Sequence, residues 1–130
     1  MRTFCEIYSK YILPALRRII ANILIQDYSL SQVEAARKLG VSQPAISYYI
    51  SSKRGYKLFT ILENDEEIVE MCRRVAEQII KGNRDAVARY FCGLCFTVRI
   101  KQEMLGEILE SLKLSNMQIF FPDEFYMPRK

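Results

Sequence analysis

Two sets of side chains in this 130-residue chain have types and spacings that could do chemistry. The first is a run of short polar, amide and tyrosine side chains over residues 42–51, preceded by Ala36 and Gly40. An alanine lets two helices cross closely, and a glycine tolerates the positive φ of a tight turn. The arrangement predicts a helix-turn-helix over roughly residues 31–52, whose second helix enters the major groove of DNA.

The second helix of this motif is expected to turn apolar residues inward and polar residues outward. The residues that we expect to face a shared core are Val33, Leu39, Val41, Ile46 and Ile50. Those that we expect to face outward are Ser42, Gln43, Pro44, Ser47, Tyr48 and Ser51. Short or amide-bearing side chains suit a helix that reads base edges. The alternative is a helical hairpin that merely packs, but packing alone does not require polar residues at the outward positions.

The run 39–47 resembles the turn and recognition helix of the phage-repressor type of helix-turn-helix. The longer run 14–55 is similar to a group of short archaeal predicted transcriptional regulators. Members of that group also tend to carry a Cys-x-x-Cys stretch in their second half, which Cys92 and Cys95 match here. The first resemblance is specific and covers a minor part of the chain, whereas the second covers most of the chain on sparser residues.

The resemblance implies different roles for the outward residues. Gln43 would read a base edge, adenine in our interpretation, because an amide can pair with the acceptor and the donor of adenine together. The base contacts that it implies are Gln43, Pro44, Ser47 and Tyr48. The phosphate contacts that it implies are Gln32, Ser42, Ser51, Lys53 and Arg54. The alternatives are burial of Tyr48 at a domain or dimer contact, and a solvated helix end at Lys53 and Arg54.

The second set is four cysteines in a chain without histidine: Cys5, Cys72, Cys92 and Cys95. Cys92 and Cys95 lie three apart on an expected helix and so on one face, and Cys72 on the preceding helix could approach them. Three interpretations stay open: small buried core residues, a redox-active or disulfide-forming pair, or ligands of zinc or an iron–sulfur cluster. We favour the first and otherwise expect no cofactor.

Helical periodicity dominates the elements that must hold these residues. We expect helices over about residues 3–11, 14–26, 32–39, 43–53, 56–63, 65–81 and 84–99, the last of them able to continue to about 112, and a strand is the alternative for 56–63. Pro14 fits the first turn of its helix. The apolar faces that we expect are Leu16, Ile19, Ile20, Ile23 and Leu24 in 14–26, and Ile68, Cys72, Val75 and Ile79 in 65–81. Ser31 with Glu34 reads as a capping box, Asn64 as a helix start, and Gly93 and Gly106 as weak points. The stretch 116–130 should be an extended tail. The expected fold class is therefore all-α.

The charge is unevenly divided along the chain. Residues 1–63 carry nine Lys or Arg and four Asp or Glu, whereas residues 64–130 carry ten and eleven. A polyanion would be attracted to the first half. We therefore expect a helix-turn-helix DNA-binding domain over 1–60, followed over 61–130 by a helical dimerisation or sensor region with an aromatic tail.

Other classes of protein find little support. We see no apolar stretch long enough to span a bilayer and no secretory signal, so we expect a cytoplasmic location and no membrane partner. The missing histidine removes the commonest general base, and no nucleophile–base arrangement with lysine is evident. We therefore do not expect an enzyme. A protein that coats DNA without reading it would favour lysine and arginine on the outward helix face, and these are absent there.

The leading hypothesis is a transcriptional regulator that binds double-stranded DNA sequence-specifically as a homodimer, because readers with one helix-turn-helix gain affinity on two half-sites. The tail aromatics Phe120, Phe121, Phe125 and Tyr126 are expected to pack across a two-fold interface, and the alternative is a tail that folds back onto its own chain. The runner-up function is a redox- or metal-responsive interaction module in which the helix-turn-helix is mainly scaffold.

Overall fold

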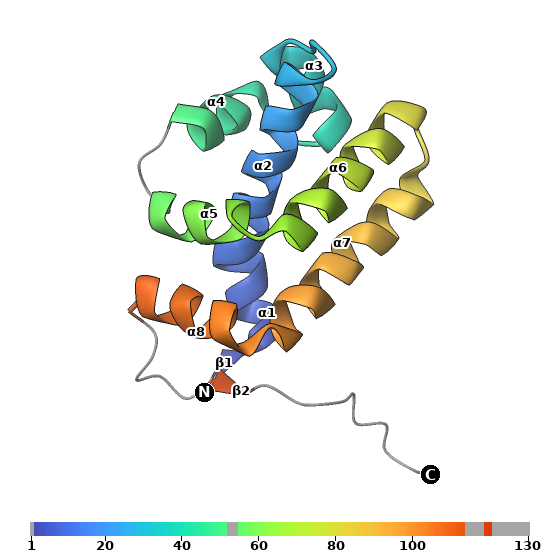
Figure 1. The fold of residues 1–130 in the computed structure, drawn as a ribbon. Helices are drawn as coiled ribbons and strands as arrows, with labels where there is room; N and C mark the ends of the chain where they lie inside the picture. Colours follow the sequence, from blue (N-terminus) through green and yellow to red (C-terminus); the bar gives the residue numbers. More distant parts are fainter. Residues whose placement is uncertain (1, 52–54, 114–118, 121–130) are drawn as a thin grey trace.

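A computed structural model describes residues 2–51, 55–113 and 119–120, and helices dominate these ranges (Figure 1). In chain order the elements are β1 (Arg2–Thr3), α1 (Phe4–Ile7), a π-helical turn η1 (Tyr8–Ile12), α2 (Leu13–Gln26), α3 (Gln32–Leu39), α4 (Gln43–Ser51), α5 (Tyr56–Glu63), α6 (Glu66–Lys81), α7 (Arg84–Ile100), α8 (Gln102–Ser111) and β2 (Ile119–Phe120). The predicted all-α class is confirmed. The end predicted for the α4 helix near Lys53 lies outside the described residues.

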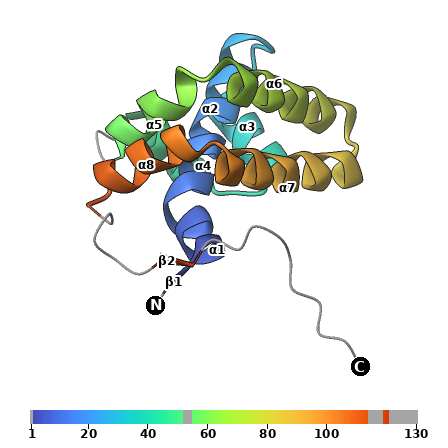
Figure 2. The same cartoon turned by 60° about the horizontal axis from the view of Figure 1, so that its bottom comes forward.

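Helix α2 packs against η1, α3, α4, α5 and α6, and it runs through the middle of the helices in the second view (Figure 2). Its expected apolar face is confirmed, since Leu16, Ile20 and Leu24 have no exposed surface. Each such burial contributes ~1.5–3 kcal/mol to folding. Residues of α1, α2, α5, α6, α7 and α8 form one hydrophobic core. The segments 1–60 and 61–130 thus share a core, and the different roles assigned to them stay a prediction.

The start of α2 follows from Pro14, which lies in the first turn as predicted. Proline has no amide hydrogen for the carbonyl four residues earlier, so regular helical bonding is interrupted just before it. The interruption coincides with the π-helical turn η1. The chain therefore runs from α1 into α2 without leaving the helical path, where the sequence predicted a separate short helix.

Helices α6 and α7 form a long antiparallel pair in which Gly82, at φ +75°, ends α6. The predicted buried face of α6 is confirmed for Ile68, Cys72, Val75 and Ile79. The predicted helix start at Asn64 is off by one residue, because Asn64 ends α5 and Asp65 caps α6. The Asp65 carboxylate accepts a hydrogen bond of 3.0 Å from the Ile68 amide, which satisfies a backbone group that the helix leaves open.

The helix that begins at Arg84 ends at Ile100, and α8 begins at Gln102. The predicted weak points at Gly93 and Gly106 are wrong, since both glycines lie inside regular helices. The break falls at Lys101, whose ammonium lies 3.1 Å from the Asp65 carboxylate and 3.3 Å from that of Glu67. These ion pairs hold the α7–α8 junction against the start of α6, a long-range constraint that periodicity does not reveal.

The described part of the tail is β2, which pairs in parallel with β1 so that Ile119 stands opposite Arg2. This pairing lies within one chain, as in the fold-back alternative, and the expected packing of the tail aromatics across a two-fold interface stays a prediction. The aromatic residues Phe121, Phe125 and Tyr126 lie outside the described residues. Over the ranges described here, the helices are too short or too polar to cross a membrane.

Candidate nucleic-acid interface

The predicted capping box at the start of α3 is confirmed. The Ser31 hydroxyl accepts a 3.1 Å hydrogen bond from the Glu34 amide, and the Glu34 carboxylate accepts one of 3.3 Å from the Ser31 amide. The hydrogen bonds from Ser31 hold the pKa of Glu34 below its usual range. Because both backbone donors are satisfied, α3 begins at a defined residue and with a defined direction.

The turn between α3 and α4 also has the predicted geometry. Gly40 adopts φ +73°, in the left-handed region, and ends α3. The amide of Val41 then donates a 3.0 Å hydrogen bond to the Ala36 carbonyl, which closes the turn. Ser42 caps α4, since its hydroxyl accepts a 3.2 Å bond from the Ala45 amide. The two helices are therefore joined by a short, fully bonded connection.

A small second core holds α4 against α2 and α3. It consists of Ala21, Ala36 and Ile46, and Leu39, Val41 and Ile50 pack around it partly buried. The inward positions are thus confirmed except for Val33, which is 59% exposed. The contact side of α3 is centred on its buried alanines, and Val33 lies roughly 110° around the helix from that centre. The prediction failed for Val33 because its position on α3 points away from the place where α3 crosses α2 and α4.

The outward face of α4 carries the predicted polar residues. Gln43, Ser47 and Ser51 are spaced four apart and share one face, with Gln43 and Ser51 exposed and Ser47 half-buried. The Ser51 hydroxyl donates a 2.7 Å hydrogen bond to the Ser47 carbonyl. Pro44 is exposed beside this row, and Tyr48 is 51% exposed. The sequence-predicted phosphate contacts Lys53 and Arg54 lie outside the described residues.

The most specific feature of this face is a hydrogen bond between its two glutamines. The Gln43 amide nitrogen donates to the Gln32 side-chain oxygen at 2.9 Å, across eleven residues of sequence. A glutamine amide has two N–H donors and one oxygen acceptor. The bond therefore leaves Gln43 with one donor and its oxygen, and leaves Gln32 with both of its donors. Sequence reasoning selected both residues for other reasons and did not foresee their contact.

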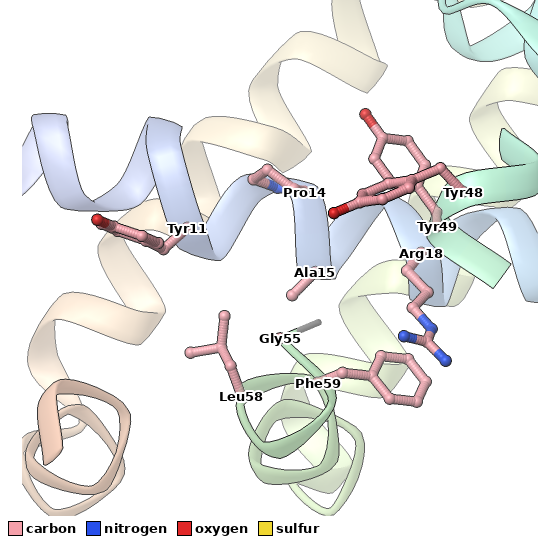
Figure 3. A pocket seen from close by; sticks show the side chains of 9 residues that line it. All are labelled: Tyr11, Pro14, Ala15, Arg18, Tyr48, Tyr49, Gly55, Leu58 and Phe59. Carbon is pink, nitrogen blue, oxygen red and sulfur yellow. The ribbon is translucent and has the colours of Figure 1, made fainter. Parts of the chain in front are cut away.

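Arg18 on α2 lies between the end of α4 and α5, and Figure 3 shows its side chain between those of Tyr49 and Phe59. Its guanidinium donates a 3.3 Å hydrogen bond to the Ile50 carbonyl in the last turn of α4. The same group lies 4.3 Å from the ring centre of Phe59 on α5, within cation–π range. A positive charge at a helix C-terminus is also favoured by the helix dipole. Sequence reasoning missed this residue, because Arg18 lies on the side of α2 opposite Leu16 and Ile20 and its partners are far along the chain.

A small cavity of about 90 Å³ lies beside Arg18, between α2, α4 and α5 (Figure 3). The side chains that line it are Tyr11, Pro14, Ala15, Arg18, Tyr48, Tyr49, Gly55, Leu58 and Phe59. Tyr48 thus has one side on this cavity and the other in solvent. The sequence left two interpretations of Tyr48 open, burial at a contact and DNA contact. The side on the cavity suits the first, and the exposed side suits the second.

The cysteines lie away from this face. Cys72 is fully buried in the main core, and burial raises the pKa of its thiol to about 12. A thiol with that pKa stays protonated at neutral pH, which disfavours both nucleophilic attack and metal binding. Cys92 and Cys95 lie on α7 as predicted, with Cys92 exposed, and Cys5 is exposed on α1. Within the described ranges, no three of these or of the acidic residues come together as metal ligands.

Tyr8 lies close to the cysteines on α6 and α7. Burial, and then the neighbouring thiols of Cys95 and Cys72, raise the pKa of its hydroxyl. That hydroxyl donates a 3.1 Å hydrogen bond to the Phe91 carbonyl. Tyr8 therefore ties α7 to the N-terminal helical segment as a neutral hydroxyl donor.

Comparison with known proteins adds one finding. Residues 14–52, which span α2, α3 and α4, match a family described as winged helix-turn-helix DNA-binding. Neither a curated protein nor a solved structure matches the chain significantly. The chain therefore carries a helix-turn-helix DNA-binding domain, as expected of a DNA-binding regulator. Where a wing would follow, the described chain continues into helix α5.

Proposed function

We propose that this protein is a transcriptional regulator that reads a specific sequence of double-stranded DNA as a homodimer. The observation that carries the proposal is the hydrogen bond between Gln43 and Gln32. It joins the outward sides of α3 and α4 and orients the Gln43 side-chain amide. This amide makes no contribution to the hydrophobic core. A helical pair that only packs gains little by ordering two glutamines at its exposed face, since fixing long side chains costs entropy.

The groups left free by this bond match adenine. In the major groove adenine presents the N7 acceptor and the N6 donor side by side. Gln43 retains one N–H donor and its side-chain oxygen, so it can bind both at once. Ser47 lies one turn further along the same face and would meet the next bases. Gln32 would hold the Gln43 amide in its orientation before DNA arrives.

Neutral groups supply several of the proposed phosphate contacts. Gln32 keeps two N–H donors for a phosphate oxygen. The Ser51 hydroxyl is exposed and would exchange its bond to the Ser47 carbonyl for one to a phosphate oxygen. The only acidic residue between positions 31 and 51 is Glu34, whose carboxylate is engaged in the capping box. Nothing on this face would therefore repel the backbone strongly. Lys53 and Arg54 would add the contacts whose counterion release makes affinity depend on salt.

A stripe on α7 would accept the second copy. Cys92, Phe96 and Ile100 are spaced four apart and all exposed, with Phe96 at 52% and Ile100 at 56%. Rows of this spacing form the ridges that pack into the grooves of a neighbouring helix. The same stripe in a second copy is an apolar partner related by a two-fold axis. We therefore place the homodimer interface on α7 and expect Phe96→Glu with Ile100→Glu to give a monomer in sedimentation equilibrium.

Selection of bound fragments from a randomised duplex pool tests the proposed function. Wild type, Gln43→Ala and the matched control Gln102→Ala, at an exposed position of α8, are run in parallel. We expect wild type and Gln102→Ala to enrich one inverted repeat, and Gln43→Ala to lose one base preference within it. Retention of DNA only at low salt, with no enriched sequence, would overturn specific readout.

A further inference from the structure

A groove separate from the DNA-reading face runs between the last turn of α3 and the facing ends of α6 and α7. Figure 1 shows where these ends lie, around the connection between α6 and α7. The groove has a volume of about 510 Å³, within the range of small-molecule sites. The residues that line it are Arg37, Lys38, Gln78, Ile79, Gly82, Arg84, Val87, Ala88 and Phe91.

The charge in this groove is one-sided. Arg37, Lys38 and Arg84 line it, and no acidic residue does. In the part of the chain described here, these three cations form no ion pair. Cations on the outer faces of α6 and α7 behave differently: Lys81 lies 3.0 Å from Glu77, and Arg89 lies 2.9 Å from Asp85. The groove therefore gathers three cations and has no carboxylate in its lining, although Glu34 on the same helix interacts with Arg37 and Lys38 at longer range.

The base of the groove is apolar. Ile79 is buried, and Val87 and Phe91 are half-buried, so their exposed parts face the groove between the cations. A purely inorganic anion would leave this apolar surface in contact with water. A ligand with an apolar body would cover it and gain roughly 25 cal/mol for each Å² removed from water.

We infer that this groove binds a small anionic amphiphile, a molecule with one carboxylate, sulfonate or phosphate head and an apolar body. The head would lie among the guanidinium and ammonium groups of Arg37, Lys38 and Arg84. The body would lie on Ile79, Val87 and Phe91. Arginine is suited to such heads because its planar group can bind two of their oxygens together.

The position of the groove gives the ligand a regulatory consequence. Arg37 and Lys38 belong to the last turn of α3, directly before the Gly40 turn that leads into α4. A ligand held by α3 on one side and by α6 and α7 on the other would fix the helix that supports α4. This consequence rests on the proposed function. By linkage, the ligand and the DNA site would change each other's affinity by the same factor.

Titration of the full chain with decanoate, below its micelle concentration and without DNA, tests the binding directly. Two-dimensional NMR should show saturable shifts at the amides of Lys38, Gly82 and Ala88. Acetate, which lacks the apolar body, and decyltrimethylammonium, which lacks the negative head, should leave these amides unmoved. Shifts spread evenly over the apolar surface, or equal shifts with the cationic detergent, would overturn the proposal.

The variant pair Arg37→Gln with Arg84→Gln removes two cations at exposed positions. We expect it to weaken decanoate binding at least about tenfold, the loss of a single charge-assisted hydrogen bond or more. The matched control, Arg73→Gln with Arg74→Gln, makes the same charge change on the outer face of α6, where both arginines pair with Glu70. It should bind decanoate like wild type. Equal weakening in both pairs would show a general charge effect and overturn the site.

DNA binding separates this inference from the proposed function. Suppose that decanoate binds as expected while selection from the duplex pool enriches no sequence. That result would support the ligand groove and contradict the proposed function as a sequence-specific regulator. If Arg37→Gln with Arg84→Gln lowers DNA affinity in the absence of decanoate but leaves the decanoate shifts unchanged, the cations contact phosphates and the amphiphile site is wrong.

Discussion

The helix pairs α3–α4 and α6–α7 have similar turns but differ in how much of each pair is buried in a hydrophobic core. Each first helix ends at a glycine in the left-handed region, Gly40 at φ +73° and Gly82 at φ +75°. The pair α6–α7 belongs to the main core and compensates several outer cations with its own carboxylates. The pair α3–α4 has a small core around Ile46 and an outward face of amides and hydroxyls. The supporting pair α6–α7 thus satisfies many of its polar groups internally, while the pair α3–α4, which we propose reads DNA and call the reading pair, leaves donors and acceptors free.

The largest expected effect is a difference in core stability between the two pairs. Leu94→Ala on α7 should cost about 3–5 kcal/mol, because Leu94 is fully buried in the main core and a cavity would remain. Ile46→Ala should cost about 2 kcal/mol, since the small core can collapse around the gap. Urea unfolding measures both. A larger cost for Ile46→Ala than for Leu94→Ala would contradict the assignment of α6–α7 as the supporting pair.

Arg18 should matter to the reading pair more than its neighbour does. Arg18→Met loses the hydrogen bond to the Ile50 carbonyl and the contact with Phe59, at a cost of about 1–2 kcal/mol. Arg17→Met on the same helix serves as the control, because Arg17 is also half-buried. Hydrogen exchange at the end of α4 should accelerate for Arg18→Met only. Equal exchange in both variants would show that Arg18 does not hold this end.

The two helix-ending glycines offer a matched pair of substitutions. Space is open around both, so an added Cβ meets no atom within 4 Å, and the cost is backbone strain alone. Gly40→Ala and Gly82→Ala should each destabilise the fold by about 1 kcal/mol. Only Gly40→Ala should also weaken DNA binding, because it changes the angle at which α4 leaves α3. Equal DNA affinity in the two variants would remove that turn from the interface.

Acid should weaken α6 more than α3. Partial burial alone would raise the pKa of Asp65, but the Ile68 amide and Lys101 hold it below its usual value of 3.8. Hydrogen bonds from Ser31 hold the pKa of Glu34 below its usual 4.5. A carboxyl with a lower pKa in the folded state stabilises the fold above its ordinary pKa, and this is lost as the pH falls through the folded value.

Urea midpoints measured from pH 6 to pH 2.5 would show this difference. Asp65→Asn should flatten the acid decline of stability clearly, because Asp65 has both a helix amide and an ammonium as partners. Glu34→Gln should flatten it only slightly, because Glu34 is fully exposed and water screens its interactions. A larger effect of Glu34→Gln would contradict the ranking of the two caps.

Local signals predicted most of the fold and the polar outward face of α4. Caps, helix-ending glycines and apolar periodicity act within a few residues, and they placed α2, α3, α5 and α6 correctly. What the sequence did not predict depends on partners far along the chain. The break at Lys101 follows from Asp65, thirty-six residues away, and the contact of Arg18 follows from Ile50. Val33 is exposed because the crossing, and not the helix itself, decides which side of α3 is inward.

The most direct test of the central claim is a double-mutant cycle between the Gln43 side chain and the N7 atom of one adenine in the DNA. In the selected site each adenine is replaced in turn by 7-deazaadenine, which lacks the N7 acceptor, and affinities are measured for wild type and Gln43→Ala. At one adenine, wild type should lose about tenfold in affinity while Gln43→Ala loses nothing further, because the donor that meets N7 is already absent. Equal losses for both proteins at every adenine would contradict readout by Gln43.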